Sequence, residues 1–177
     1  SDNRLEMALV DLACLSAGLV NIMVPANSTE VDVGYMLRHS EAGAVIVSDA
    51  RQLEKVRRQR DSLPALKRIV VIDPRGVSGD DVLTLDALST RAAHIPASLV
   101  ASRSEAVRID DTATVMYTSG TTGTPKGIEF SHRNLVFKRF ARALALPEIG
   151  EEDRFLCFLP LFHTFGRFLE MLGCVFW

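Results

Sequence analysis

Short apolar runs that alternate with helical patterns are the feature that most constrains the fold of this chain. The first three runs cover residues 19–25, 44–47 and 69–72, and glycine, proline or aspartate bounds them. Such runs, rich in β-branched residues, are typical of buried strands. Helical patterns fill residues 30–42 and 49–60, and Thr29 suits the N-cap of the first. This order predicts an α/β fold of mainly parallel sheets flanked by helices in three layers.

Further elements are expected on both sides of this unit. Apolar spacing predicts a helix from residue 5, a short helix over residues 83–92 and strands over residues 113–117 and 155–159. Ser131 suits the N-cap of one more helix. In the first helix we expect an inward-facing stripe of Leu5, Ala8, Leu9 and Leu12. In the last helix the expected inward-facing residues are Val136, Phe140, Ala143 and Leu144. The expected outer face of that helix carries Lys138, Arg139 and Arg142.

The alternation of apolar runs and helical patterns is less regular between about residues 75 and 111, where glycine and serine interrupt it. We therefore predict that residues 1–110 form a first α/β portion with a loose connector after about residue 75. Residues 111–177 would begin a second α/β portion.

Composition narrows the class of protein and of ligand. The 177 residues are 47% hydrophobic and 24% charged, with a net charge of -2, which is typical of a globular protein and argues against nucleic acid as a partner. Cys14, Cys157 and Cys174 lie in apolar segments and are expected to be buried thiols of a reducing compartment. No signal-peptide pattern and no apolar run of ~20 residues is present, so we expect a cytoplasmic location.

A loop of hydroxyls and glycines follows the strand predicted at residues 113–117. Residues 117–127 read Y-T-S-G-T-T-G-T-P-K-G. Glycines let backbone N–H groups turn toward an anion, hydroxyls donate beside them, and Lys126 adds a positive charge. The pattern predicts a phosphate-binding loop, and the alternative is a polar surface turn. Pro125 and Thr122 stand where the P-loop and dinucleotide motifs require glycine, so neither motif is present.

This loop resembles that of the adenylate-forming, AMP-binding superfamily of acyl-CoA synthetases, luciferases and peptide-synthetase adenylation domains. Residues 158–166, F-L-P-L-F-H-T-F-G, are similar to the second core block of that family. Residues 11–25 and 46–48 also resemble the segment that precedes the loop in fatty acyl-CoA synthetases. The resemblance therefore covers essentially the whole chain.

The resemblance implies that a fatty-acid carboxylate attacks the α-phosphorus of ATP, that pyrophosphate leaves, and that the acyl-adenylate passes to coenzyme A. Mg²⁺ and donor groups would stabilise the charge on pyrophosphate. By the same resemblance, Thr118 and Lys126 are the catalytic residues, and Thr118 also helps to hold the metal. The β- and γ-phosphates would be held by Thr118, Ser119, Gly120, Thr121, Thr122, Gly123 and Lys126.

His163 has two interpretations. The resemblance places it at the mouth of the acyl pocket, where it would position the carboxylate, whereas a histidine between aromatic residues is also commonly a hydrogen-bonded core residue. Arg167 stands where certain fatty-acid enzymes carry an aromatic gate, which leaves the acyl-chain length open.

The chain lacks counterparts of the family's downstream acidic motif, ribose-binding aspartate, hinge and C-terminal catalytic lysine. We therefore expect an N-terminal fragment that is inactive alone, that self-associates through apolar surface, and whose full-length form can contact a membrane peripherally. The alternatives are a fatty acyl-AMP ligase or peptide-synthetase domain that loads a carrier protein, and a non-catalytic phosphate-binding module.

Overall fold

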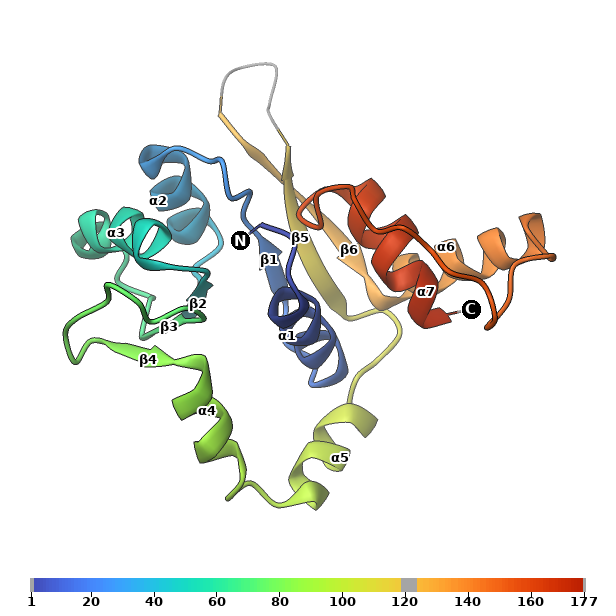
Figure 1. Cartoon of the computed structure of the whole chain (residues 1–177), viewed down its shortest axis with the longest axis horizontal. Coiled ribbons are helices and arrows are strands. Elements are labelled where there is room, and N and C mark those ends of the chain that lie inside the picture. The colour runs from blue at the N-terminus through green and yellow to red at the C-terminus, as the bar shows by residue number, and fades with distance from the viewer. Residues whose placement is uncertain (1, 119–123, 177) are drawn as a thin grey trace. The chain divides into compact units, whose positions relative to one another are not determined.

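The computed structural model describes residues 2–118 and 124–176 (Figure 1). Residues Ser119 to Gly123 of the predicted phosphate loop lie outside the described residues. The elements, in order, are α1 (Leu5–Ser16), β1 (Asn21–Met23), α2 (Glu30–His39), β2 (Ala44–Val47), α3 (Ala50–Arg58), η1 (Arg60–Ser62), β3 (Arg68–Val71), β4 (Val82–Thr84), α4 (Leu85–Ala92), α5 (Ala97–Glu105), β5 (Thr112–Thr118), β6 (Lys126–Ser131), α6 (His132–Ala145), η2 (Phe165–Met171) and α7 (Leu172–Phe176).

The elements group into two compact units. Unit 1 contains residues 24–102 and unit 2 contains residues 2–23, 103–118 and 126–176. The segment predicted as the first portion, residues 1–110, thus contributes to both units, because α1 and β1 pack with β5. The domain division predicted near residue 110 stays a prediction, and the two units are described separately below.

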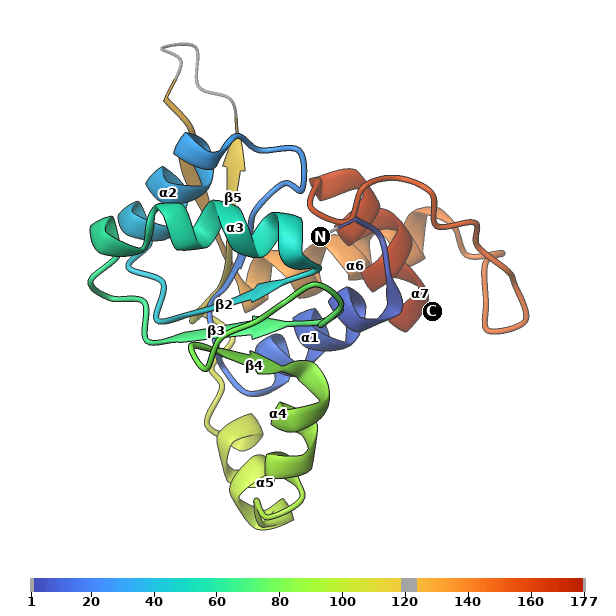
Figure 2. The same ribbon diagram turned by 60° about the vertical axis from the view of Figure 1, so that its left-hand side comes forward.

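A parallel sheet in the order β2–β3–β4 forms the centre of unit 1 (Figure 2). Ile69, Val70 and Val71 of β3 are all buried, which is typical of a central parallel strand. The strands predicted over residues 44–47 and 69–72 are therefore confirmed, within a residue at each end.

Local capping sets where the helices of unit 1 begin. The Thr29 hydroxyl accepts the Asp32 backbone N–H at 3.1 Å and starts α2, as predicted. Asp49 accepts the Gln52 backbone N–H at 3.0 Å and starts α3. The two helices pack against each other on one side of the sheet, and Met36 and Leu37 of α2 are buried with Leu53 and Val56 of α3.

Unit 2 contains a mixed sheet in the order β1–β5–β6. β1 pairs with β5 in parallel, and β5 pairs with β6 in an antiparallel manner. The sequence did not predict β6, because Gly127 and the charged Lys126 and Glu129 give it no apolar pattern. Parallel pairing in both sheets, covered by helices, confirms the α/β class.

The core of unit 2 consists of Ala113 and Met116 of β5, Leu135 of α6, and Phe168 and Leu172 at the C-terminal end. The predicted inward face of α6 is wrong in part. Val136, Phe140 and Leu144 are 51%, 56% and 68% exposed, whereas Arg139, which was expected outside, is only 5% exposed. Periodicity alone could not decide between the two faces, because both carry apolar residues. Lys138 is exposed, as predicted, and Arg142 is partly buried.

Three smaller expectations also failed. Leu5 and Leu9 of α1 are exposed, so its predicted stripe is buried only in part. Residues 155–159 form no strand in the described part of the chain, and their apolar side chains have no neighbouring strand there to cover them. Cys157 and Cys174 are exposed and Cys14 is partly buried, so the prediction of three buried thiols is wrong.

Candidate functional site

The described part of the phosphate loop consists of its two ends. Thr118 ends β5, Lys126 begins β6, and the two residues are direct partners across the antiparallel pair. Both are exposed. Within residues 2–118 and 124–176, no hydrogen bond or ion pair is found for the Lys126 side chain.

The sequence of β5 explains why the loop emerges at Thr118. Ala113, Thr114 and Met116 are buried, and the strand then passes through the half-buried Tyr117 to the exposed Thr118. Gly127 lies opposite Tyr117, and a Cβ atom there would be 3.1 Å from the Val115 side chain. Gly127 thus allows the two strands to stay close where the hairpin leaves the core.

A capping box fixes the other end of β6. The Ser131 hydroxyl accepts the Asn134 backbone N–H at 3.3 Å, and Asn134 Oδ1 accepts the Ser131 backbone N–H at 2.9 Å. The predicted Ser131 cap is confirmed. β6 therefore runs from Lys126 directly into a helix with a defined start.

His163 lies in the turn before η2, in the same unit as β5 and β6. Its backbone N–H donates to the Pro160 carbonyl at 2.9 Å, and its Nδ1 accepts the Phe165 N–H at 3.3 Å. The residue is exposed, so its interpretation as a core histidine is wrong. Its predicted role at an acyl pocket stays a prediction.

A buried polar network connects the His163 segment to β5. The Arg167 guanidinium donates from Nε and Nη2 to Asp11 at 2.7 and 2.5 Å, and from Nη1 to the Thr114 hydroxyl at 2.6 Å. Thr114 in turn donates to the Asn21 carbonyl at 2.6 Å, and Asn21 donates to Asp11. Arg167, Asp11 and Thr114 are at most 1% exposed.

Sequence reasoning missed this network. Asp11 stands between apolar residues of a helical pattern, and Arg167 and Glu170 are the charged residues of an otherwise apolar C-terminal segment. Charges in such positions are rarely buried unless they are paired. That signal marks the residues as unusual, but it does not show which partner each one has.

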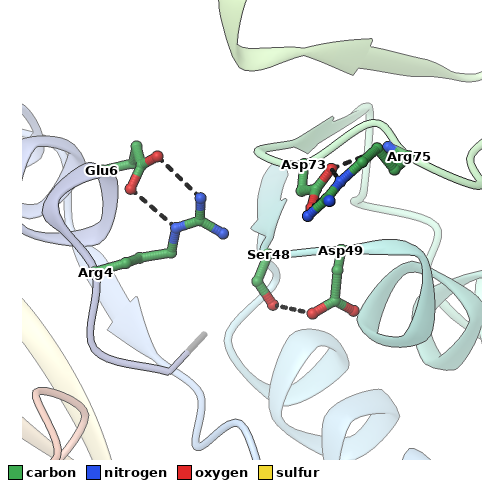
Figure 3. Close-up of polar contacts among 6 residues, drawn as sticks. All are labelled: Arg4, Glu6, Ser48, Asp49, Asp73 and Arg75. Carbon is green, nitrogen blue, oxygen red and sulfur yellow. Dashed lines mark hydrogen bonds and ion pairs between the residues drawn. The ribbon is translucent and has the colours of Figure 1, made fainter.

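Figure 3 shows polar contacts between residues that are one or two positions apart in the sequence. In unit 1, the Ser48 hydroxyl donates to Asp49, and Arg75 pairs with Asp73 two residues away. Desolvation alone would raise the pKa of Asp49, but hydrogen bonds from the Gln52 backbone N–H and the Ser48 hydroxyl outweigh it and lower the pKa. In unit 2, Arg4 lowers the pKa of Glu6 to about 2 through hydrogen bonds near the start of α1.

Neither a metal centre nor a membrane helix is found in the part of the chain that the structure describes. Over those residues, no three His, Cys, Asp or Glu side chains gather so that they could hold a metal ion. No helix among them has the length and apolar character needed to cross a bilayer.

Comparison with known proteins identifies the family. The model of the family described as "AMP-binding enzyme" matches residues 1–177. The chain therefore belongs to the AMP-binding enzyme family, as its loop and its L-P-L-F-H block predicted.

The curated relatives include ligases with different acceptors. The chain is 35% identical to the long-chain-fatty-acid–CoA ligase FadD15 of Mycobacterium bovis, over 97% of this chain and 28% of that protein. It is 28% identical to a chloroplastic long-chain-fatty-acid–acyl-carrier-protein ligase of Arabidopsis thaliana, over 96% of this chain and 25% of that protein. The chain thus spans about a quarter of the length of these relatives.

The solved structures support the fold. ATP-bound MatB of Rhodopseudomonas palustris superposes with a TM-score of 0.72 at 24% sequence identity. The match covers 99% of this chain and 32% of that one. The α/β arrangement derived from the strand pairing is therefore also found in this solved structure.

Proposed function

We propose that this chain is the N-terminal, phosphate-loop part of an enzyme that activates a fatty acid with ATP and transfers the acyl group to coenzyme A. The observation that carries the proposal is the pairing of Thr118 with Lys126 at the exposed end of the β5–β6 hairpin. A hydroxyl and an ammonium group face solvent there, on either side of a loop rich in further hydroxyls and glycines. Family membership supports the same role.

The residues of the hairpin suit the charge that develops in adenylation. As the carboxylate attacks the α-phosphorus, the bond to pyrophosphate breaks and negative charge gathers on the leaving group. Lys126 and the loop donors would stabilise that charge, and they need no reorganisation if β5 and β6 hold them in place. Mg²⁺, when bound, would add the largest local positive charge, with the Thr118 hydroxyl and phosphate oxygens among its ligands.

The names of the relatives indicate which carboxylic acid is activated and which thiol accepts the acyl group. The named relatives include a ligase for coenzyme A and one for an acyl-carrier protein, and both act on long-chain fatty acids. We favour coenzyme A because the relative with the higher identity uses it. Since the chain spans 28% of that relative, we expect no catalysis by these residues alone.

ATP–pyrophosphate exchange tests this function in the full-length protein. We expect exchange that depends on a long-chain fatty acid, followed by release of thioester when coenzyme A is added. Thioester formation with an acyl-carrier protein in place of coenzyme A would favour the second acceptor. A full-length protein that shows no fatty-acid-dependent exchange would contradict the proposal and favour a non-catalytic phosphate-binding module.

A further inference from the structure

A chain of contacts runs from β5 to the backbone of His163. Arg167 lies one helical turn after His163, and its backbone N–H donates to the His163 carbonyl at 3.0 Å. Its side chain reaches Thr114, four residues before Thr118 on β5, and Asp11 on α1. One residue therefore joins the segment that carries His163 to the strand that leads into the phosphate loop.

The segment between Leu159 and Glu170 is itself held in one shape. Glu170 is 2% exposed and accepts the Leu159 backbone N–H at 2.9 Å. A Cβ atom at Gly166 would lie 2.6 Å from the Leu159 carbonyl oxygen and closer still to that of Pro160, so the turn closes more tightly than any side chain there would permit. A displacement of Arg167 would thus be passed to His163 because the turn between them has little freedom.

Stability alone is a weak explanation for a charged network at this place. Taking a guanidinium and a carboxylate out of water costs free energy that their attraction only partly offsets, and apolar residues of similar volume often stabilise a core as well or better. Apolar residues, however, make no directional hydrogen bonds that could fix one element against another. The planar guanidinium has donors on three nitrogens, and here it contacts α1 and β5 at once, which a lysine could not do with the same geometry.

We propose that Arg167, held by Asp11 and Thr114, is a positioning residue that sets the turn carrying His163 against β5, the strand that ends at Thr118. The inference rests on the proposed function and on the place at the acyl pocket that the family resemblance implies for His163, where the carboxylate would meet ATP. Arg167 acts through the backbone of η2 and the strand β5. Because Thr118 and Lys126 take no part in the network, its loss should misalign the two substrates and leave ATP binding largely intact.

The test uses the full-length protein with the variants R167M, D11N and D11N/R167M. The single variants each leave one buried charge without its partner and should lower the Tm. The double variant removes both charges, and the amide introduced at position 11 can still accept from Asn21, so its Tm should return to within a few degrees of that of the unsubstituted protein. We expect its kcat for fatty-acid-dependent exchange to stay lower by about 100-fold, with the KM for ATP changed less than about threefold.

A second pair of variants, T114V and T114S, tests the same role without leaving a buried charge unpaired. T114V keeps the shape and the Arg167–Asp11 pair but removes the hydroxyl that binds Arg167, whereas T114S retains it. We expect T114V to lower kcat by about tenfold and T114S to restore most of the rate. R133M is the matched control, because Arg133 forms a bidentate pair with Asp110 in the same unit but is 60% exposed. It should leave the rate unchanged.

The outcomes separate the two proposals. If kcat of D11N/R167M recovered together with its Tm, Arg167 would have a structural role only. Full activity of T114V would likewise overturn the positioning role of Arg167. Absence of exchange in the unsubstituted protein would instead overturn the proposed function.

Discussion

Arg139 carries a buried guanidinium that lacks hydrogen-bond partners among the described residues. It is 5% exposed, and its Nη1 and Nη2 atoms have no hydrogen-bond partner among the described residues. Desolvation and the neighbouring Arg142 lower its pKa to about 10. A buried charge without a partner destabilises the folded state, since water solvates it better in the unfolded chain.

We predict that R139M stabilises this chain by about 1–3 kcal/mol at pH 7, measured as an increase in Tm. The gain should shrink as the pH rises through about 10, because the folded protein releases the proton of Arg139 there more readily than the unfolded chain does. K138M changes the exposed neighbouring cation and should leave Tm nearly unchanged. A clear decrease in Tm for R139M would show that the guanidinium has a partner.

Cys157 is exposed, but its thiol is expected to react slowly. Although the residue is exposed, desolvation of its sulfur and the Glu170 carboxylate raise the pKa of its thiol to about 11. The thiolate is the reactive form, so alkylation by iodoacetamide should be slow at pH 7.5 and should accelerate up to about pH 11. E170Q should raise the rate at pH 7.5. Peptide mass spectrometry would follow both rates, and rapid alkylation of the unsubstituted chain at pH 7.5 would contradict this account.

At the scale of elements, the turn before η2 depends on Gly166. Its Cβ position lies 2.6 Å from the carbonyl oxygen of Leu159 and closer still to that of Pro160, both of which are backbone atoms. We predict that G166A destabilises the chain by about 1–3 kcal/mol or more, measured by denaturant unfolding. G43A is the control, because nothing lies within 4 Å of its added methyl group. Equal midpoints for the two variants would show that the turn can relax.

Elements that local sequence determines were predicted well. Thr29 and Ser131 start α2 and α6 because each binds a backbone N–H three residues away, an interaction that needs nothing from elsewhere in the chain. The β-branched run of β3 likewise gave its position. Each of these depends on residues that are close in sequence.

Elements that depend on distant partners were predicted poorly. β6 exists because β5 pairs with it, although its own residues are largely exposed. Residues 155–159 have the composition of a strand but no partner strand in the described chain. At the candidate site, Lys126 and His163 were found through motifs, whereas the Asp11–Arg167 contact joins residues 156 positions apart and carries no local signal.

At the scale of the molecule, apolar side chains remain exposed on one helix and one extended segment of unit 2. Val136, Phe137, Phe140 and Leu144 of α6 are 51–69% exposed, and Leu156 and Phe158 are 77% and 69% exposed. Large apolar surfaces of this kind promote association. We predict that the 177-residue chain self-associates in solution, with a mass that rises with concentration in light scattering. A monodisperse monomer would contradict this prediction.

The loop between Thr118 and Lys126 is proposed to hold the phosphates of ATP during acid activation. The most direct measurement is fatty-acid-dependent ATP–pyrophosphate exchange by the full-length protein with K126A, and with K126R as the variant that keeps the charge. We predict that K126A lowers the exchange rate by at least about 100-fold, with Tm unchanged because Lys126 is exposed, and that K126R retains part of the rate. Exchange by K126A at the rate of the unsubstituted protein would contradict the claim.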